Sequence, residues 1–224
     1  MILEKDKEKL ISLSELADQL YQAYSNKNKI TPIQLNKEDS DIVWKMFSKK
    51  LIEKEGFGGY KIGSKFFGIL TEKMLVKSQK IRLNYDSHKA ELEIVLDANA
   101  PFDWNVEKQF HMHIGVELPS SRFFPKPSDP NCIQADNGAA SLAFVGERIS
   151  TNDVNYEFSV SLNGEHIRHG SPNYKIQDRV DILKKEFGAL KGYLFLGNFL
   201  EPFQVKRGDV ITVDGSTKFS LYFY

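Results

Sequence analysis

The hydrophobic pattern of this chain changes its period near Gly56, and that change limits the folds open to it. Before Gly56, apolar residues recur every three or four positions, which is typical of amphipathic helices. After Gly56, glycines separate short runs of aromatic and β-branched residues, which indicates strands and tight turns. We therefore expect an α+β fold, with a helical segment over residues 1–55 and a β-rich domain over residues 56–224 that forms one structural unit.

Two helices are expected in the first segment. Ser12 to Glu15 has the form of a capping box, which predicts that the first helix begins at Ser12, with the charged residues before it as a solvated lead-in. The second helix is predicted to begin at Asp39 or Ser40 and to end before Gly56.

Six strands, one helix and two long loops are predicted for the β-rich domain. The strands are 81–85, 90–96, 109–118, 156–162, 210–213 and 219–223; the helix is 177–187; the loops are 119–137 and 163–174.

Charge and cysteine content exclude several classes of partner. Thirty basic and thirty acidic residues give a net charge of zero, so we expect no nucleic-acid partner and no attraction to an anionic membrane surface. The single cysteine excludes a disulfide framework and fits a reducing compartment. No apolar run approaches the length of a membrane span. We therefore expect a cytoplasmic protein.

Two of the predicted strands carry their ionisable residues on one side. Over residues 90–96 every second position is apolar, and Glu91 and Glu93 share the other face, about 7 Å apart. The strand at 110–118 alternates in the same way, and its polar face carries His111, His113 and Glu117. Either these faces are solvated, or they point into one cavity. In a cavity the carboxylates would repel one another unless a dication such as Mg²⁺ or Mn²⁺ neutralised them.

The histidines allow a rival interpretation. His111, His113 and Glu117 have the ligand spacing of the first cupin motif, which would hold iron, manganese or zinc. The glycines that flank that motif, and a convincing second motif with a later histidine, are missing. A cupin-like metal enzyme is therefore kept as an alternative.

Several short motifs occur in a fixed order along nearly the whole chain. They are GYKIG at 59–63, FGIL at 67–70, ELEIVL at 91–96, GVELPSSRF at 115–123, ADNGAA at 135–140, GYLFLGNFLEP at 192–202 and GD at 208–209. In this order and spacing they resemble the 2-keto-4-pentenoate hydratase and 4-oxalocrotonate decarboxylase branch of the fumarylacetoacetate hydrolase superfamily.

The resemblance implies a fold and a metal site. The fold would be a mixed β-sandwich roll preceded by helices, and the chain would assemble into a homo-oligomer. Glu91, Glu93 and Glu117 would bind a divalent metal, Mg²⁺ or Mn²⁺, and Lys61 of GYKIG would face the substrate as the catalytic lysine.

The same resemblance suggests further contacts with the substrate. Asp136 and Asn137 of the ADN motif would line the same cavity. His113 is a third candidate substrate contact. The family does not lead us to expect a histidine there. Its members carry an acidic residue near the substrate between the GYKIG-type and FGIL-type motifs; this chain lacks that residue, and the imidazole could replace it.

The activity implied is that of a metal-dependent lyase of the hydratase type, acting on a 2-oxo or 2-hydroxy-dienoic acid through a metal-stabilised enolate. Decarboxylation and C–C hydrolysis use the same chemistry. However, only residues 64–66 separate GYKIG from FGIL, which is shorter than in the family and could remove a wall of the active site. The alternative is a non-catalytic binding or assembly subunit that keeps the fold.

Overall fold

The computed structural model describes residues 4–63, 65–85, 87–99, 111–149 and 156–224. Within these ranges the helices are α1 (Glu4–Asn26), α2 (Lys37–Glu55), α3 (Pro130–Ala135) and α4 (Ile176–Phe187), with a short 3₁₀ turn, η1 (Asn137–Ala139). The strands are β1 (Phe57–Ile62), β2 (Phe67–Thr71), β3 (Leu75–Val76), β4 (Lys80–Ile81), β5 (Ser87–Asp97), β6 (Met112–Leu118), β7 (Leu142–Ile149), β8 (Phe158–Leu162), β9 (Glu165–Gly170), β10 (Tyr193–Asn198), β11 (Phe203–Lys206), β12 (Val210–Asp214) and β13 (Lys218–Phe223).

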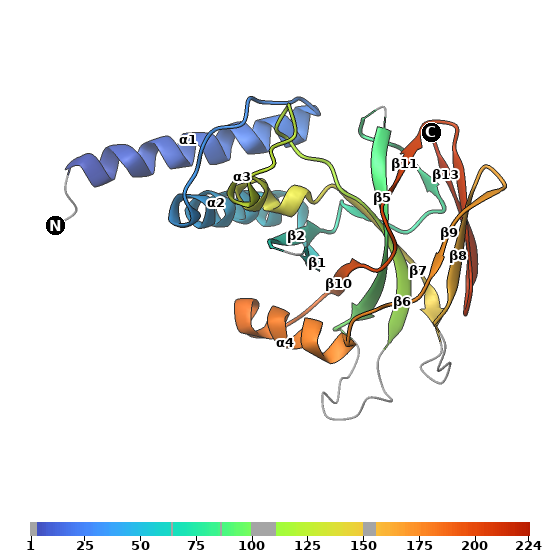
Figure 1. Ribbon diagram of the computed structural model, residues 1–224. Coiled ribbons are helices and arrows are strands. Elements are labelled where there is room, and N and C mark those ends of the chain that lie inside the picture. Colours follow the sequence, from blue (N-terminus) through green and yellow to red (C-terminus); the bar gives the residue numbers. More distant parts are fainter. Residues whose placement is uncertain (1–3, 64, 86, 100–110, 150–155) are drawn as a thin grey trace.

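The strands form two sheets. The larger sheet has the order β2-β1-β10-β5-β6-β7-β3, and β11 also pairs with β5. It is mixed, because β1 runs parallel to β10 whereas β5 is antiparallel to both β10 and β6. The smaller sheet has the order β4-β13-β12-β8-β9. The predicted α+β class, with helices ahead of a curled mixed β-roll, is confirmed by this arrangement (Figure 1).

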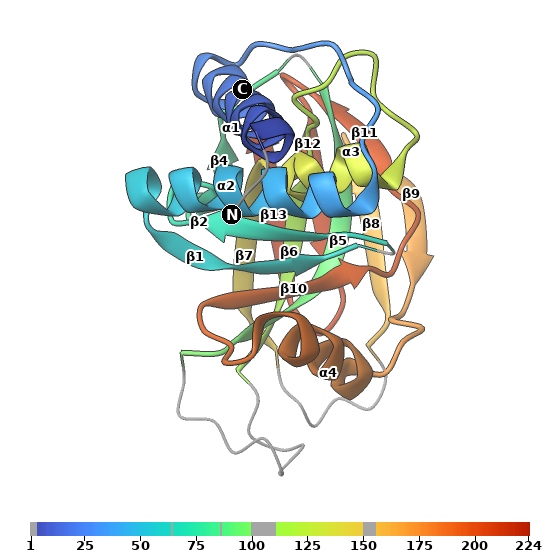
Figure 2. The ribbon, with the colours of Figure 1, turned by 90° about the vertical axis from the view of Figure 1, so that its left-hand side faces the viewer.

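Each face of the larger sheet is covered by a different layer. The apolar face of β5 and β6 belongs to the core shared with the smaller sheet and α4, as the predicted alternation requires. The opposite face packs against α1 and α2 through residues such as Val95 and Phe195. Figure 2 shows α1 and α2 crossing above β1 and β2, and α4 below β10. Glu91 and Glu93 have the same strand parity as Val95 and so lie on this helix-covered face.

The helix boundaries differ from the prediction at their N-terminal ends. The first helix begins at Glu4, so Ser12 lies inside it and the capping box does not form the helix start. The charged lead-in is helical, and Lys9 from this stretch forms an ion pair of 2.7 Å with Asp39 at the start of α2. The second helix begins at Lys37, where the side chain of Asn36 accepts a hydrogen bond from the Asp39 N–H. Its predicted end before Gly56 is confirmed.

Several β elements were missed or misplaced. Strands β1, β2, β3, β7, β10 and β11 were not among the six predicted strands, and the expected loop 163–174 contains β9. The loop 119–137 contains α3, and the strand expected at 81–85 is limited to Lys80–Ile81. The strand expected at 109–118 is described from Met112 onwards, and its first two positions lie outside the described residues. No helix in the described ranges combines the length and apolar character that a membrane span requires.

Candidate metal and substrate site

The register of β5 against β6 brings the three predicted glutamates together. Glu91 lies directly opposite Glu117, and Glu93 lies opposite Gly115. As a result, one carboxylate oxygen from each of Glu91, Glu93 and Glu117 lies within 4.8 Å of the others. In the part of the chain that the structure describes, these residues form the one group of three or more ionisable ligands close enough to hold a metal ion.

The electrostatics of this cluster suit a hard dication. Glu93 and Glu117 are fully buried, and Glu91 is half-buried. Burial, with the nearby Glu117, raises the pKa of Glu93 well above its ordinary value. Burial likewise raises the pKa of Glu117 to about 7, although Lys61 acts to lower it. The Oε2 atom of Glu117 is buried and has no hydrogen-bond partner. Three oxygen donors, one of them unsatisfied, fit Mg²⁺ or Mn²⁺.

Lys61 lies against this cluster from β1. Its ammonium group donates hydrogen bonds to Glu117 Oε1 and to the carbonyl oxygen of Gly138, the latter at 3.1 Å. Burial alone would lower the pKa of Lys61, but Glu117, Glu91 and Glu93 together outweigh it, and the pKa is raised. The raised pKa keeps Lys61 protonated at neutral pH, so its ammonium group can donate a proton.

A close approach of backbone to side chain explains the glycine of the FGIL motif. A Cβ at Gly68 would lie 2.5 Å from the carbonyl oxygen of Asn137 and 2.8 Å from Cγ of Lys61. Because real Cβ atoms do not approach other atoms this closely, a side chain here would force the Asn137 backbone or the Lys61 side chain to shift. Gly68 thus allows Lys61 to extend between β2 and η1 towards Glu117.

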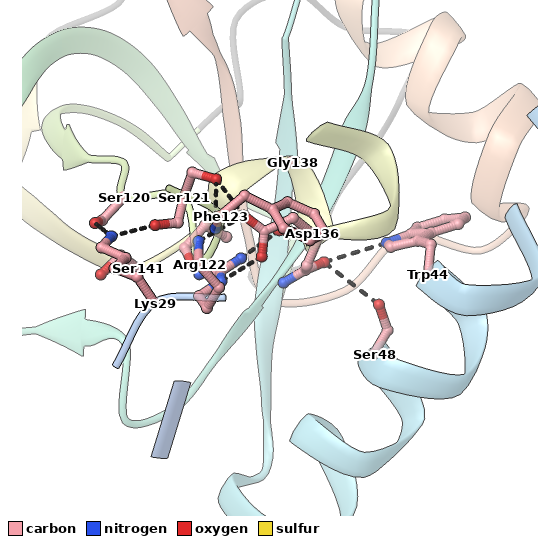
Figure 3. A network of polar contacts seen from close by, with 12 residues as sticks. Lys29, Trp44, Ser48, Ser120, Ser121, Arg122, Phe123, Asp136, Gly138 and Ser141 are labelled. Carbon is pink, nitrogen blue, oxygen red and sulfur yellow. Dashed lines mark hydrogen bonds and ion pairs between the residues drawn. The ribbon is translucent and has the colours of Figure 1, made fainter. Parts of the chain in front are cut away.

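Asp136 lies in a buried network that holds the chain before η1 (Figure 3). Its carboxylate accepts hydrogen bonds from the Ser121 hydroxyl at 2.8 Å, from the Arg122 backbone N–H at 2.8 Å and from Arg122 Nε at 2.5 Å. Arg122 also donates to the carbonyl oxygens of Asp136 and Ala140. The pair is almost completely buried. Both carboxylate oxygens of Asp136 are therefore engaged within the protein.

Asn137 ties η1 to β2 and α2. Its side chain accepts from the Ile69 N–H at 2.7 Å and donates to the Ile69 carbonyl at 2.8 Å. From α2, Trp44 Nε1 and the Ser48 hydroxyl also donate to Asn137 Oδ1 (Figure 3). These bonds fix the turn whose Gly138 carbonyl accepts from Lys61. Asp136 and Asn137 therefore position the cavity wall, and their direct contact with substrate stays a prediction.

A cavity of about 210 Å³ opens beside the carboxylates. Lys61, Glu91, Glu117, Lys126 and Asn198 are among its polar lining residues. Phe66, Pro119 and Ile133 contribute apolar surface. Pockets for drug-sized ligands occupy about 300–1,000 Å³. This cavity therefore suits a small polar ligand.

The predicted histidine contacts lie away from this cavity. His113 is four residues from Glu117, a distance of about 13 Å along a strand. Between them, a Cβ at Gly115 would lie 2.5 Å from Val95 Cγ2 and 2.9 Å from Phe195 Cε1, so apolar side chains separate the two ends of the face. His113 Nδ1 instead lies 2.9 Å from the Gly146 carbonyl oxygen. The cupin-like set of His111, His113 and Glu117 does not assemble.

Two polar lining residues, Lys126 and Asn198, were not singled out from the sequence. Asn198 belongs to the GYLFLGNFLEP run that carried part of the resemblance, so its motif was a usable signal. Lys126 lies in the predicted loop 119–137 with only a Pro-rich context to mark it. Nothing in that stretch reveals which side chain reaches the cavity.

Comparison with solved structures identifies the fold. Sequence comparison matches no family model and no curated protein. The structure of 4-oxalocrotonate decarboxylase from Pseudomonas putida G7, complexed with magnesium and adipate, superposes with a TM-score of 0.79 at 19% identity, over 95% of this chain and 97% of that chain. The same enzyme complexed with calcium and acetate gives 0.76 at 18% identity, over 97% and 98%.

A different protein gives a weaker structural match. A putative fumarylacetoacetate hydrolase family protein from Yersinia pestis CO92 gives a TM-score of 0.53 at 15% identity, over 75% of this chain and 94% of that chain. The expected fold is thus confirmed: the chain shares its fold with 4-oxalocrotonate decarboxylase and, less closely, with a putative fumarylacetoacetate hydrolase family protein.

Proposed function

We propose that this protein is a metal-dependent lyase that acts on a small 2-oxo or 2-hydroxy-dienoic acid. The observation that carries the proposal is the convergence of Glu91, Glu93 and Glu117 beside a cavity that also contains Lys61. The likeness to 4-oxalocrotonate decarboxylase supports the same class of chemistry. Addition of water, as in a hydratase, is the reaction we propose, and decarboxylation is the competing outcome.

The three glutamates would hold the dication. When bound to them, it would supply a Lewis acid for the carboxylate and 2-oxo oxygens of the substrate. Glu91 and Glu117 line the cavity, whereas Glu93 lies behind them and is fully buried. This arrangement leaves the side towards the cavity for the substrate.

Lys61 would act as the proton donor and would stabilise negative charge on a substrate oxygen. It is an ammonium ion held by Glu117 and the Gly138 carbonyl, and it opens onto the same cavity. A positioned ammonium stabilises negative charge that develops on a substrate oxygen. It can also transfer a proton to the substrate during the reaction.

The charges of the cavity favour an anionic substrate. With a dication in place, the site charge would be −3 from the three glutamates, +2 from the metal and +2 from Lys61 and Lys126, giving +1. A cavity of about 210 Å³ limits the substrate to a small acid.

Turnover measurements with defined acids test the proposal. Chelator-treated protein would be incubated with a 2-hydroxy-dienoate or with 4-oxalocrotonate, with and without Mg²⁺ or Mn²⁺, while dienol absorbance is followed. We expect turnover that requires the metal and is lost in Glu93→Gln, because that change removes a buried ligand. Exposed Glu147 provides a matched control, and Glu147→Gln should retain full activity.

The products separate the possible reactions. A hydrated product without release of CO₂ supports the hydratase, and release of CO₂ supports decarboxylation. Absence of turnover with every acid, combined with normal metal binding, would instead support the non-catalytic subunit suggested by the short connection after Gly63. Turnover at an unchanged rate in Glu93→Gln would contradict the proposed site.

A further inference from the structure

The carboxylate of Glu93 is held by the backbone of β10. The Gly197 N–H donates a hydrogen bond of 2.8 Å to Glu93 Oε2. Pairing between β10 and β5 is irregular here, since the register shifts between Phe195 and Asn198, and Asn198 lies opposite Glu93. Gly197 adopts a φ of +91°, which favours glycine. This local bulge directs the Gly197 N–H at the carboxylate.

The peptide backbone of Gly197 is also held by Tyr174. The Tyr174 hydroxyl donates a hydrogen bond of 2.8 Å to the Gly197 carbonyl oxygen. Burial and the nearby Glu93 carboxylate raise the pKa of Tyr174, so the hydroxyl keeps its proton and remains a donor. The guanidinium group of Arg179, on α4, lies 4.8 Å from the centre of the Tyr174 ring. The hydrogen bond at its hydroxyl and the Arg179 contact at its ring therefore fix the orientation of Tyr174.

We propose that Tyr174 is a positioning residue for Glu93, acting through the backbone of Gly197. The inference rests on the proposed function, in which Glu93 is a metal ligand. It extends the site to the segment between β9 and α4, from which no residue lines the cavity.

The hydrogen bonds explain how a residue outside the cavity affects metal binding. Without the Tyr174 hydroxyl, the Gly197 carbonyl loses its donor in a part-buried environment, which is unfavourable. Gly197 lacks a side chain to hold its conformation, so it can reorient to find another donor. Such a change would turn its N–H away from Glu93 Oε2 and leave the carboxylate less well placed as a ligand.

Titration of Mn²⁺ into chelator-treated full-length protein tests this inference without any need for activity. Outer partners of metal ligands typically contribute about 10–100-fold to affinity, and Tyr174 acts one hydrogen bond further out. We therefore expect Tyr174→Phe to weaken Mn²⁺ binding by about 3–10-fold, which also matches the loss of one neutral hydrogen bond. Exposed Tyr222 provides the control, and Tyr222→Phe should bind Mn²⁺ as the wild type does.

A second measurement separates positioning from general stabilisation. The thermal unfolding midpoint of each variant would be recorded in chelator. A lower midpoint for Tyr174→Phe with an unchanged Kd for Mn²⁺ would overturn the inference, because the tyrosine would then serve only the fold. If the wild type itself bound no Mn²⁺, the metal site of the proposed function would fail, and that outcome is distinct from equal binding by both proteins.

Discussion

Replacement of Asp136 by asparagine should destabilise the protein strongly while leaving the shape of the side chain nearly unchanged. Arg122 and Asp136 form an ion pair in which the side chains are only 1% and 0% exposed. The substitution removes the charge that compensates the buried guanidinium group. Loss of one partner from a buried ion pair typically costs about 3–5 kcal/mol of stability. We expect the free energy of unfolding to fall by about 3 kcal/mol or more.

The environment of the pair bears on the size of this loss. Burial raises the pKa of Asp136, while Arg122 and Ser121 act to lower it. The hydrogen-bond geometry, with three donors directed at two oxygens, favours an ionised carboxylate at neutral pH. If Asp136 were protonated instead, asparagine would mimic it and the loss would be small.

Urea unfolding at pH 7, followed by circular dichroism, measures the effect. Asp214→Asn is the matched control, because Asp214 pairs with Lys218 at 2.5 Å on the exposed β12–β13 hairpin. Exposed ion pairs contribute about 0–1 kcal/mol. A loss below about 1 kcal/mol for Asp136→Asn, similar to that of the control, would refute the argument that a buried ion pair holds this wall of the cavity.

Two further predictions concern pH and substrate choice. Burial lowers the pKa of His88 to about 4, although the backbone carbonyl oxygens of Leu118 and Pro119 act to raise it. Since the unfolded chain takes up this proton near pH 6.5, the wild type should lose up to about 1.4 kcal/mol of stability per pH unit between pH 6.5 and 4 relative to His88→Gln. Parallel pH dependence of the two unfolding curves would contradict this. Lys126→Gln should weaken inhibition by small dicarboxylic acids more than by monocarboxylic acids. Of the two lysines that line the cavity, Lys61 is hydrogen-bonded to Glu117, which leaves Lys126 to bind a second carboxylate of the ligand. Equal effects on both acid classes would show that Lys126 does not bind a second carboxylate.

Part of the site could be predicted because alternating apolar residues show which face of a strand packs in the core. The apolar face of β5 and β6 was assigned correctly, because it packs in the core. The opposite face carries the glutamates but is not simply polar, since Val95 packs there in a second hydrophobic core with α1 and α2. Glu91 lies opposite Glu117 because of the register between the two strands, whereas alternation within one strand shows only which face each residue occupies. Bringing Lys61 to the same place requires β1 and β10 to insert beside β5, a long-range arrangement.

Two of the missed strands, β9 and β10, lack the alternation on which the prediction relied. Four successive residues of β10, Leu194 to Gly197, are buried, so this strand reads as a continuous apolar run. The opposite holds for β9, which is polar along most of its length and packs against the core through the half-buried Ile167. Polar character alone also misled the interpretation of His113, because a shared face does not bring residues four positions apart into contact.

The most direct test of the account is the binding of one divalent cation by Glu91, Glu93 and Glu117. Calorimetric titration of Mn²⁺ into chelator-treated protein should give one ion per chain. Glu93→Gln and Glu117→Gln should each weaken binding by at least about tenfold, since loss of a ligand exceeds loss of an outer partner. Exposed Glu147→Gln should have no effect. Wild-type protein that binds no ion, or Glu93→Gln and Glu117→Gln variants that bind as tightly as the wild type, would contradict the central claim.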